Sequence, residues 1–382
     1  MTLKLSRRGQ VPPFIVMDVM RAAAEREATG ADVLHLEVGQ PSTGAPRKVL
    51  EAAEAALKSG EALGYTLALG IPELRDAIAR HYRDFYGVSV PAERIVVTTG
   101  SSGAFLLGFL AAFDAGERVA MASPAYPAYK NILRALDIEA VEIPAGEPER
   151  WQAVPDLVRR AGKVDGLIIA SPANPTGTML RPEELAEITR HCAAEGIRLV
   201  SDEIYHGLTY GPEAATALQY GEEAIVINSF SKYFSMTGWR LGWMVVPQGL
   251  LRVVECLAQN LFISPPTLSQ RAAIAAFEAH DELEANRARY ARNRELLLAE
   301  LPKAGFDRLA PADGAFYLYA EIGHLTNDSE AFCRRMLKET GIAATPGVDF
   351  DPVRGSATMR FSFAGSEATI AEAARRLRAW RR

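Results

Sequence analysis

Lys232 is the residue of this sequence best suited to covalent chemistry. It lies in the stretch SFSKYFSMTGWRLGW, residues 229–243, among hydroxyl and aromatic side chains and without an acidic neighbour. Burial in such surroundings disfavours the charged amine and lowers its pKa. A neutral amine is a nucleophile that forms an imine with an aldehyde. Arg240, further along the same stretch, would supply a fixed cation for a phosphate, because its planar fork suits that anion.

Small, aromatic or polar residues follow four other apolar runs of the chain. Gly100-Ser101-Ser102-Gly103 opens a helical pattern, where free backbone N–H groups favour an anion, although an ordinary serine N-cap fits the same residues. The other three runs end in a proline-rich turn with two tyrosines, an Asn-Pro turn and an acidic segment. The residues at these ends are Tyr126 and Tyr129, then Asn174, then Asp202 with Tyr205.

The five run ends suit one ligand. Taken singly, each group has a plain structural explanation, such as a surface lysine, a turn asparagine or an aromatic that fills the domain surface. Ligands gather at the carboxyl ends of parallel strands, however, so the groups would face a common point. Lys232 would match an aldehyde, Arg240 a phosphate, Tyr126 a flat ring and Asp202 a protonated ring nitrogen. Asn174 and Tyr205 would match an acceptor oxygen. Pyridoxal 5'-phosphate has each of these parts.

The strands that would position these residues are read from short, nearly continuous apolar runs, which are typical of strands buried on both faces. Helical patterns at 103–113 and 182–196 lie between several of them. The alternation predicts an α/β fold, with a mostly parallel seven-stranded sheet flanked by helices. The seven expected strands are 94–99, 118–123, 138–143, 166–171, 197–202, 224–229 and 241–246.

A chain of 382 residues is too long for one simple core and suggests two domains. We place the large domain at residues 45–280, which contain the regular alternation. Residues 281–382 read as a smaller α+β domain, with a charged helix pattern followed by strands at 315–322 and 358–364. Residues 1–44 precede the alternation, so we expect them to join the small domain.

Composition and charge exclude several classes of protein. The chain is 48% hydrophobic and 23% charged with a net charge of -5, which gives no sign of a nucleic-acid or anionic-membrane partner. No apolar run reaches the ~18 residues of a membrane helix, and the N-terminal MTLKLSRRGQVPPF lacks the apolar core of a signal peptide. The three cysteines and six histidines are scattered, so we expect reduced thiols, no metal site and a cytoplasmic location.

Four motifs stand in an order and at a spacing that belong to a known family. A-N-P-T-G around Asn174, D-E-x-Y from Asp202, S-x-S-K up to Lys232 and G-W-R-x-G around Arg240 follow one another. Asp202 lies 28 residues after Asn174, and Lys232 lies 30 residues after Asp202. The sequence closely resembles the class I/II aminotransferases of the aspartate aminotransferase superfamily, which have the type I pyridoxal-phosphate fold, and the resemblance runs through nearly the whole chain.

The resemblance implies a role for each site residue. Lys232, Asp202 and Tyr205 would be the catalytic residues: the amine would form the Schiff base and move the α-proton, and the carboxylate would keep the ring nitrogen protonated. The other cofactor contacts would come from Asn174 beside Tyr205, from Tyr126 on the ring, and from Ser101, Ser102, Ser229, Ser231, Arg240 and Tyr65 of the partner subunit at the phosphate. Gly39, Asn174 and Arg360 would receive the substrate carboxylate, and the family picture includes a homodimer with shared active sites.

The resemblance also implies transfer of an amino group from an L-amino acid to a 2-oxo acid by a ping-pong mechanism. A dicarboxylate donor needs a second cation at the far end of the pocket, and residues 103–113 and 260–270 contain no lysine or arginine. We therefore expect a neutral or hydrophobic donor, such as alanine or a branched or aromatic amino acid, with 2-oxoglutarate or pyruvate as acceptor. Arg7, Arg8 or the partner subunit remain alternative sources of that cation.

Other functions fit parts of the same sequence. An aspartate aminotransferase and a carbon–sulfur β-lyase of the same fold use nearly identical cofactor contacts. A regulator that kept this body would need a DNA-binding module, and the residues before 45 show no helix-turn-helix pattern or basic stripe. A nucleotide-binding doubly wound enzyme is disfavoured because no G-x-G-x-x-G follows the first strand.

Overall fold

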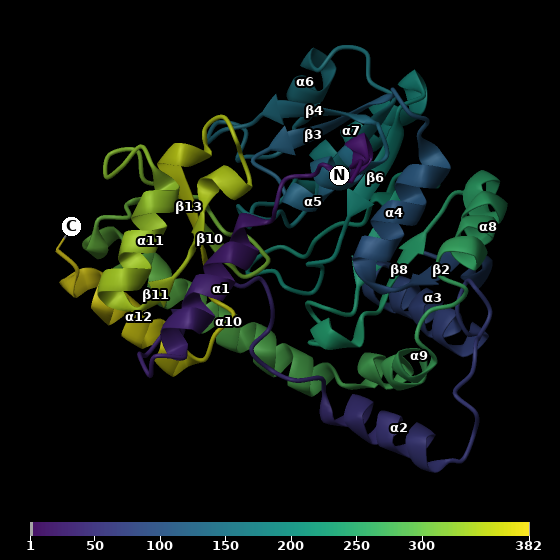
Figure 1. Cartoon of the computed structure of the whole chain (residues 1–382). Helices are drawn as coiled ribbons and strands as arrows, with labels where there is room; N and C mark the ends of the chain where they lie inside the picture. Colours follow the sequence, from purple (N-terminus) through teal and green to yellow (C-terminus); the bar gives the residue numbers. More distant parts are fainter. Residues whose placement is uncertain (1–2, 382) are drawn as a thin grey trace.

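The computed structural model describes residues 3–381 and centres on a seven-stranded sheet (Figure 1). The strand order is β2-β8-β7-β6-β5-β3-β4; β8 runs antiparallel to both neighbours and the other neighbouring strands pair in parallel. The mostly parallel sheet is therefore confirmed, and each expected run forms one strand. The strands are β2 (Ile95–Thr98), β3 (Arg118–Ser123), β4 (Glu139–Pro144), β5 (Gly166–Ala170), β6 (Arg198–Asp202), β7 (Ile225–Ser229) and β8 (Gly242–Val245).

Helices cover both faces of this sheet (Figure 1), which explains why strands such as β2, β7 and β8 are buried without alternation. All residues of β2, β7 and β8 are buried. The helices of this part are α2 (Arg47–Lys58), α3 (Pro72–Tyr86), α4 (Gly100–Ala112), α5 (Pro127–Ala135), α6 (Pro155–Arg160), α7 (Pro182–Glu195), α8 (Leu251–Leu261) and α9 (Thr267–Ala273).

A second, four-stranded antiparallel sheet lies in the C-terminal part, drawn yellow-green in Figure 1. Its order is β12-β13-β10-β9, so the two strands expected at 315–322 and 358–364 are direct neighbours. These strands are β9 (Arg308–Leu309), β10 (Tyr317–Glu321), β12 (Thr345–Pro346) and β13 (Thr358–Ser362). The helices here are α10 (His280–Glu300), α11 (Ser329–Thr340) and α12 (Glu367–Ala379).

The N-terminal segment packs on this C-terminal part. Its strand β1 (Leu34–His35) pairs in parallel with β11 (Ile342–Ala343), and its helix α1 (Ile15–Glu27) contacts β11 and β12 (Figure 1). These contacts support our division of the chain into 1–44 with 281–382 as one domain and 45–280 as the other, which we keep as a proposal.

The two sheets meet where the parallel strands end. The segment before β10 reaches across: the Gly314 amide donates to the Gly177 carbonyl and the Ala315 amide to the Leu208 carbonyl, each at 2.8 Å. Gly177 follows β5 and Leu208 follows β6, so the start of β10 is fixed against two loops at the carboxyl ends of the large sheet. Within residues 3–381, no helix has both the length and the apolar character needed to cross a membrane.

Candidate active site

A cavity of about 580 Å³ opens at the carboxyl ends of the parallel strands, between the two sheets. It collects most of the residues singled out from the sequence, although they come from strand ends far apart in the chain. Those that line it are Gly39, Ser101, Ser102, Tyr126, Asn174, Asp202, Tyr205, Ser231, Lys232, Arg240 and Arg360. Ser229 and Tyr65 do not line it: the first lies buried behind Ser231, and the second is 83% exposed on another part of the surface.

Lys232 follows β7 and extends its amine into the cavity, where Nζ donates to the Gly39 carbonyl at 2.6 Å. Burial lowers the pKa of this amine to about 8, and the neighbouring positive charges of Arg360 and Arg240 act in the same direction. The negative charge of Asp202 opposes them. The amine is therefore deprotonated at a far lower pH than an ordinary lysine, as the nucleophile of an imine-forming site must be.

Asp202 ends β6 and is buried. Burial raises the pKa of its carboxyl to about 6, against two hydrogen bonds that favour the charged form: the Tyr129 hydroxyl donates to Oδ2, and the Ile204 amide donates to Oδ1 at 3.1 Å. The contact with Tyr129 was not predicted, because nothing in the sequence shows which strand end that side chain faces. A buried carboxylate aimed into a cavity suits a cationic ring nitrogen, which would restore its charged form.

An anion cradle forms where α4 begins. Gly100 has φ +69°, and a Cβ at this position would lie 2.6 Å from the Arg240 Nη2, so only glycine lets the guanidinium approach the helix N-terminus. Ser101 and Ser102 follow it, and the Ser231 hydroxyl faces the same cavity. The Ser229 hydroxyl donates to Ser231 at 2.9 Å and supports it from behind. Helix N-terminus, hydroxyls and guanidinium together fit a phosphate group.

Arg360 lies on β13, is buried and lines the cavity. Its Nη1 donates to the Asn174 Oδ1 at 2.8 Å, and its Nη2 donates to the Glu37 carbonyl and the Thr345 hydroxyl. The ring of Tyr317 lies 4.2 Å from the guanidinium carbon. Nε is buried and has no hydrogen-bond partner within the described part of the chain. An unsatisfied buried donor of this kind suits an incoming carboxylate.

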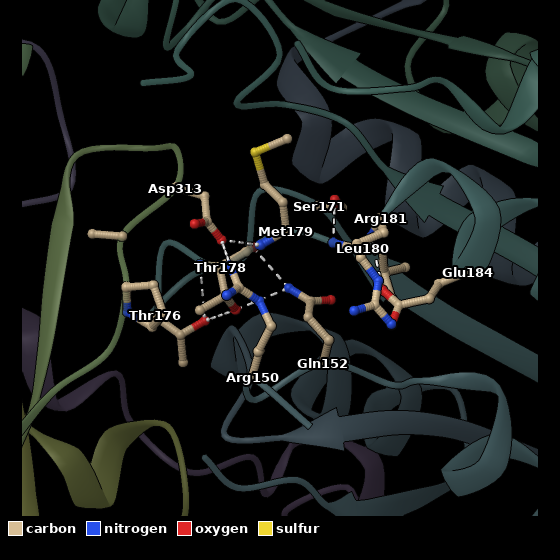
Figure 2. A network of polar contacts seen from close by, with 12 residues as sticks. Arg150, Gln152, Ser171, Thr176, Thr178, Met179, Leu180, Arg181, Glu184 and Asp313 are labelled. Atoms are coloured by element: carbon tan, nitrogen blue, oxygen red, sulfur yellow. Dashed lines mark hydrogen bonds and ion pairs between the residues drawn. The ribbon is translucent and has the colours of Figure 1, made fainter. Parts of the chain in front are cut away.

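The loop that carries Asn174 is held from both sides (Figure 2). The Asp313 carboxylate, from the segment before β10, accepts from the Met179 amide at 3.1 Å and from Arg150. From the other side, the Gln152 amide donates to the Thr178 carbonyl at 2.7 Å. Figure 2 shows these groups converging on Thr178 and Met179, so the turn that follows Asn174 in the chain is held by side chains from two other segments.

The cavity also has an apolar wall that sequence reasoning missed. It is built by the start of α1, where Val16, Met17 and Met20 follow Phe14, and by Val38. The helical spacing of these residues could have signalled a shared face, but not what that face covers. The positively charged residues lining the cavity, within residues 3–381, are Lys232, Arg240 and Arg360. Arg7 instead pairs with Asp137, away from the cavity, and Tyr317 is a further lining residue that was not predicted.

Comparison with known proteins places this geometry in a family. The model of the family described as Aminotransferase class I and II matches residues 31–377. The chain is 54% identical to the valine–pyruvate aminotransferase of Mycobacterium tuberculosis over 100% of this chain and 99% of that protein. It is 33% identical to the aspartate/prephenate aminotransferase of Thermus thermophilus, over 97% of each.

Solved structures agree with these sequence matches. The crystal structure of an aminotransferase from Mycobacterium tuberculosis superposes with a TM-score of 0.97 at 54% identity, over 99% of both chains. Aspartate aminotransferase from Thermus thermophilus, solved with maleate, superposes with a TM-score of 0.93 at 32% identity, over 99% of this chain and 100% of that one. The fold expected from the sequence is therefore the fold of these enzymes.

Proposed function

The chain belongs to the class I and II aminotransferases, pyridoxal-phosphate-dependent enzymes that move an amino group from an amino acid to a 2-oxo acid, and we propose that its preferred donor is a neutral amino acid with an apolar side chain. Pyruvate or 2-oxoglutarate is the proposed acceptor. The observation that carries the donor proposal is the apolar wall of the cavity. Any donor's side chain must lie beyond the carboxylate-binding and cofactor-binding groups. There α1 offers it valine and methionine side chains, and Phe14, just before α1, offers a phenylalanine.

Charge supports the same donor class. The three cations that line the cavity are each engaged by the reaction itself: Lys232 as the amine, Arg240 at the phosphate and Arg360 at the α-carboxylate. A second carboxylate on the donor would be desolvated against the apolar wall without a partner, which is costly. The valine–pyruvate enzyme of Mycobacterium tuberculosis, at 54% identity, acts by its name on a branched apolar donor.

We assign the steps of the reaction to the residues as follows. Bound pyridoxal phosphate would supply an aldehyde that condenses with amines and a protonated ring that withdraws electrons from the substrate Cα. Arg360 and Asn174 would hold the substrate carboxylate, and the Tyr205 hydroxyl would donate to the ring oxygen of the cofactor. The Lys232 amine, once displaced by the incoming amino group, would take the proton from Cα as a base and, as an acid, deliver it to the former aldehyde carbon of the cofactor, so that water can release the 2-oxo acid. The Asp202 carboxylate would hold the proton at the ring nitrogen throughout.

A panel of half-reactions tests the donor. The purified holoenzyme, without an acceptor, is mixed with each of twenty amino acids, and loss of the visible band of the lysine-bound cofactor gives kcat/KM for each. Valine, leucine, alanine and phenylalanine are expected to lead. A larger value for aspartate would replace the proposal by aspartate aminotransferase activity. Pyruvate released from a sulfur amino acid without any acceptor would show a β-lyase instead.

We further propose a homodimer with shared active sites, working in the cytoplasm, where the unpaired cysteines stay reduced. Tyr65 supports the dimer: it is 83% exposed, and the nearby Leu67 is also exposed. Mixed dimers of Lys232→Ala and Tyr65→Ala subunits test the arrangement. If Tyr65 acts across the interface, one site of each mixed dimer has both native residues and activity returns. If it acts within its own subunit, mixing restores nothing.

A further inference from the structure

Tyr317, the first residue of β10, contacts three parts of the proposed site at once. It is 1% exposed, and its hydroxyl lies 2.7 Å from the Tyr205 hydroxyl. Its ring lies 4.2 Å from the guanidinium carbon of Arg360. Its hydroxyl oxygen also fills the space next to the Gly39 Cα, where a Cβ would collide with it. None of the roles assigned above uses this side chain.

The direction of the hydrogen bond between the Tyr317 and Tyr205 hydroxyls depends on where the Tyr205 proton goes. Each hydroxyl has one proton to donate and lone pairs that accept. Within residues 3–381, the one hydrogen-bond partner of the Tyr317 hydroxyl is Tyr205. When the Tyr205 proton is given to an oxygen in the cavity, that bond can persist only with Tyr317 as donor and Tyr205 as acceptor. The pair then forms a directed chain of two hydrogen bonds that ends in the cavity.

We propose that Tyr317 is a positioning residue that donates its hydrogen bond to the Tyr205 hydroxyl and thereby holds Tyr205 as the donor to the ring oxygen of the cofactor. This inference rests on the proposed function. Hydrogen bonds in a chain polarise one another, so Tyr205 becomes a better donor when it also accepts. The rings of Phe316 and Tyr317 pack nearly perpendicular to the Tyr205 ring, with centroids 5.5 and 5.7 Å away, which limits its orientation.

The position of Tyr317 is fixed by the large domain although the residue belongs to the C-terminal sheet. The residues just before it, Gly314 and Ala315, donate backbone hydrogen bonds to Gly177 and Leu208. Those two carbonyls belong to the loops that carry Asn174 and Tyr205. The distance between the two hydroxyls is therefore set by backbone contacts, and a phenylalanine at 317 would keep the ring in place while removing only the oxygen.

The chain offers a matched control on the same strand. Tyr319 is also buried, and its hydroxyl contacts the Thr358 hydroxyl at 2.7 Å, away from the cavity. Tyr319→Phe deletes the same atom from the same strand and leaves the site intact. Tyr205→Phe removes the group through which Tyr317 is proposed to act. The native enzyme, Tyr205→Phe, Tyr317→Phe and the double variant Tyr205→Phe/Tyr317→Phe form a double-mutant cycle.

The readout is the pH titration of the visible band of the holoenzyme, which reports the proton on the lysine-bound cofactor. A hydrogen bond donated to the ring oxygen stabilises the anionic form of that oxygen. The proton of the lysine-bound cofactor is then released at a lower pH than in Tyr205→Phe. Tyr317→Phe should raise the pKa of the band by about 0.3 to 1 unit, the size expected for one neutral hydrogen bond. Tyr319→Phe should titrate like the native enzyme. The double variant should match Tyr205→Phe, because Tyr317 acts through Tyr205.

Two results would overturn the inference: a Tyr317→Phe band that titrates like the native one, or a double variant whose shift is the sum of the two single shifts. Binding of pyridoxal phosphate to the apoprotein gives a second readout, expected to weaken severalfold in Tyr317→Phe and not in Tyr319→Phe. Tyr317→Leu, which also removes the ring beneath Arg360, should raise KM for the amino acid, whereas Tyr317→Phe should not. A native protein without any lysine-dependent visible band would refute the proposed function itself.

Discussion

The amine of Lys232 donates a hydrogen bond to the backbone carbonyl of Gly39 at 2.6 Å. Gly39 belongs to the N-terminal segment, and Lys232 follows the central strand β7 of the large sheet. The N-terminal segment thus closes one side of the cavity directly over the reactive amine. Since burial is the largest cause of the lowered pKa of Lys232, this closure contributes to the reactivity of the site.

The apoprotein should therefore react with aldehydes at lower pH than an ordinary lysine. The pKa of Lys232 is lowered to about 8, so the neutral, nucleophilic amine prevails above that pH. We expect the rate of imine formation with pyridoxal phosphate to rise with pH and level off above an inflection near 8. Rapid-mixing absorbance across the pH range measures it, with Lys232→Ala as the blank. An inflection near the ordinary lysine value of about 10.4 would contradict this assignment.

Gly39 should tolerate no side chain, because a Cβ there would collide with the Tyr317 hydroxyl. We expect Gly39→Ala to displace the segment by a fraction of an ångström or more and to lower kcat/KM about 100-fold. Adding Tyr317→Phe removes the colliding oxygen and should recover part of that loss. Steady-state kinetics of the two single variants and the double variant measure the coupling. A double variant that is worse than Gly39→Ala would show that the collision is not the cause.

Asp349 should control selectivity for large apolar donors. Its carboxylate accepts from the Ile15 amide at 3.0 Å and the Val16 amide at 3.3 Å, so it caps α1 from the C-terminal part and fixes the apolar wall. We expect Asp349→Ala to raise KM for valine about tenfold, as for a lost apolar contact, and to affect alanine much less.

Asp328 provides the control for that prediction. It is itself the N-cap residue of α11, where its carboxylate accepts from the Ala331 amide at 2.9 Å, and it does not line the cavity. Both alanine variants should lose about 1 kcal/mol of unfolding free energy, the usual worth of a cap. The ratio of the valine to the alanine kcat/KM should change only in the Asp349 variant. An equal change in both would show an effect of stability alone.

His35 should stabilise the folded protein at acidic to neutral pH and lose this contribution as the pH becomes alkaline. Its ring nitrogens contact the carboxylates of Glu37 at 2.7 Å and Glu27 at 3.1 Å. The hydrogen bond to Glu37, followed by the one to Glu27, raises the pKa of His35 to about 9 against the effect of burial. Its contribution is therefore complete below pH 6.5 and is lost as pH rises through 9.

We expect that contribution to be about 1 kcal/mol, because the imidazole is partly exposed and solvent screens the pair. Urea unfolding of the native protein and of His35→Gln at pH values below, within and above this window measures it. The difference between the two free energies of unfolding should shrink toward zero above pH 9. A constant difference would show that the histidine acts by packing and not by charge.

The sequence alone determined the large sheet and most of the cavity lining. Apolar runs such as 224–229 become buried parallel strands, and a residue that directly follows a strand end must lie at the common edge of the sheet. The position of Asp202, Asn174 and Lys232 at or just after a strand end, together with the direction of the strands, therefore suffices to bring these residues together. Arg360 was singled out only by the family resemblance, because its apolar neighbours Met359 and Phe361 belong to the opposite face of the strand and do not show what Arg360 faces.

Only the tertiary structure decided which side chains face one another across the cavity. Alternation along β10 puts Tyr317 and Tyr319 on one face, yet one hydroxyl meets Tyr205 and the other meets Thr358. That difference depends on how residues 313–315 dock on the loops of the large sheet. The same holds for α1, whose first turns line the cavity and whose N-terminal amides donate to the distant Asp349. Such contacts join residues from 39 to 334 positions apart, so no local pattern encodes them.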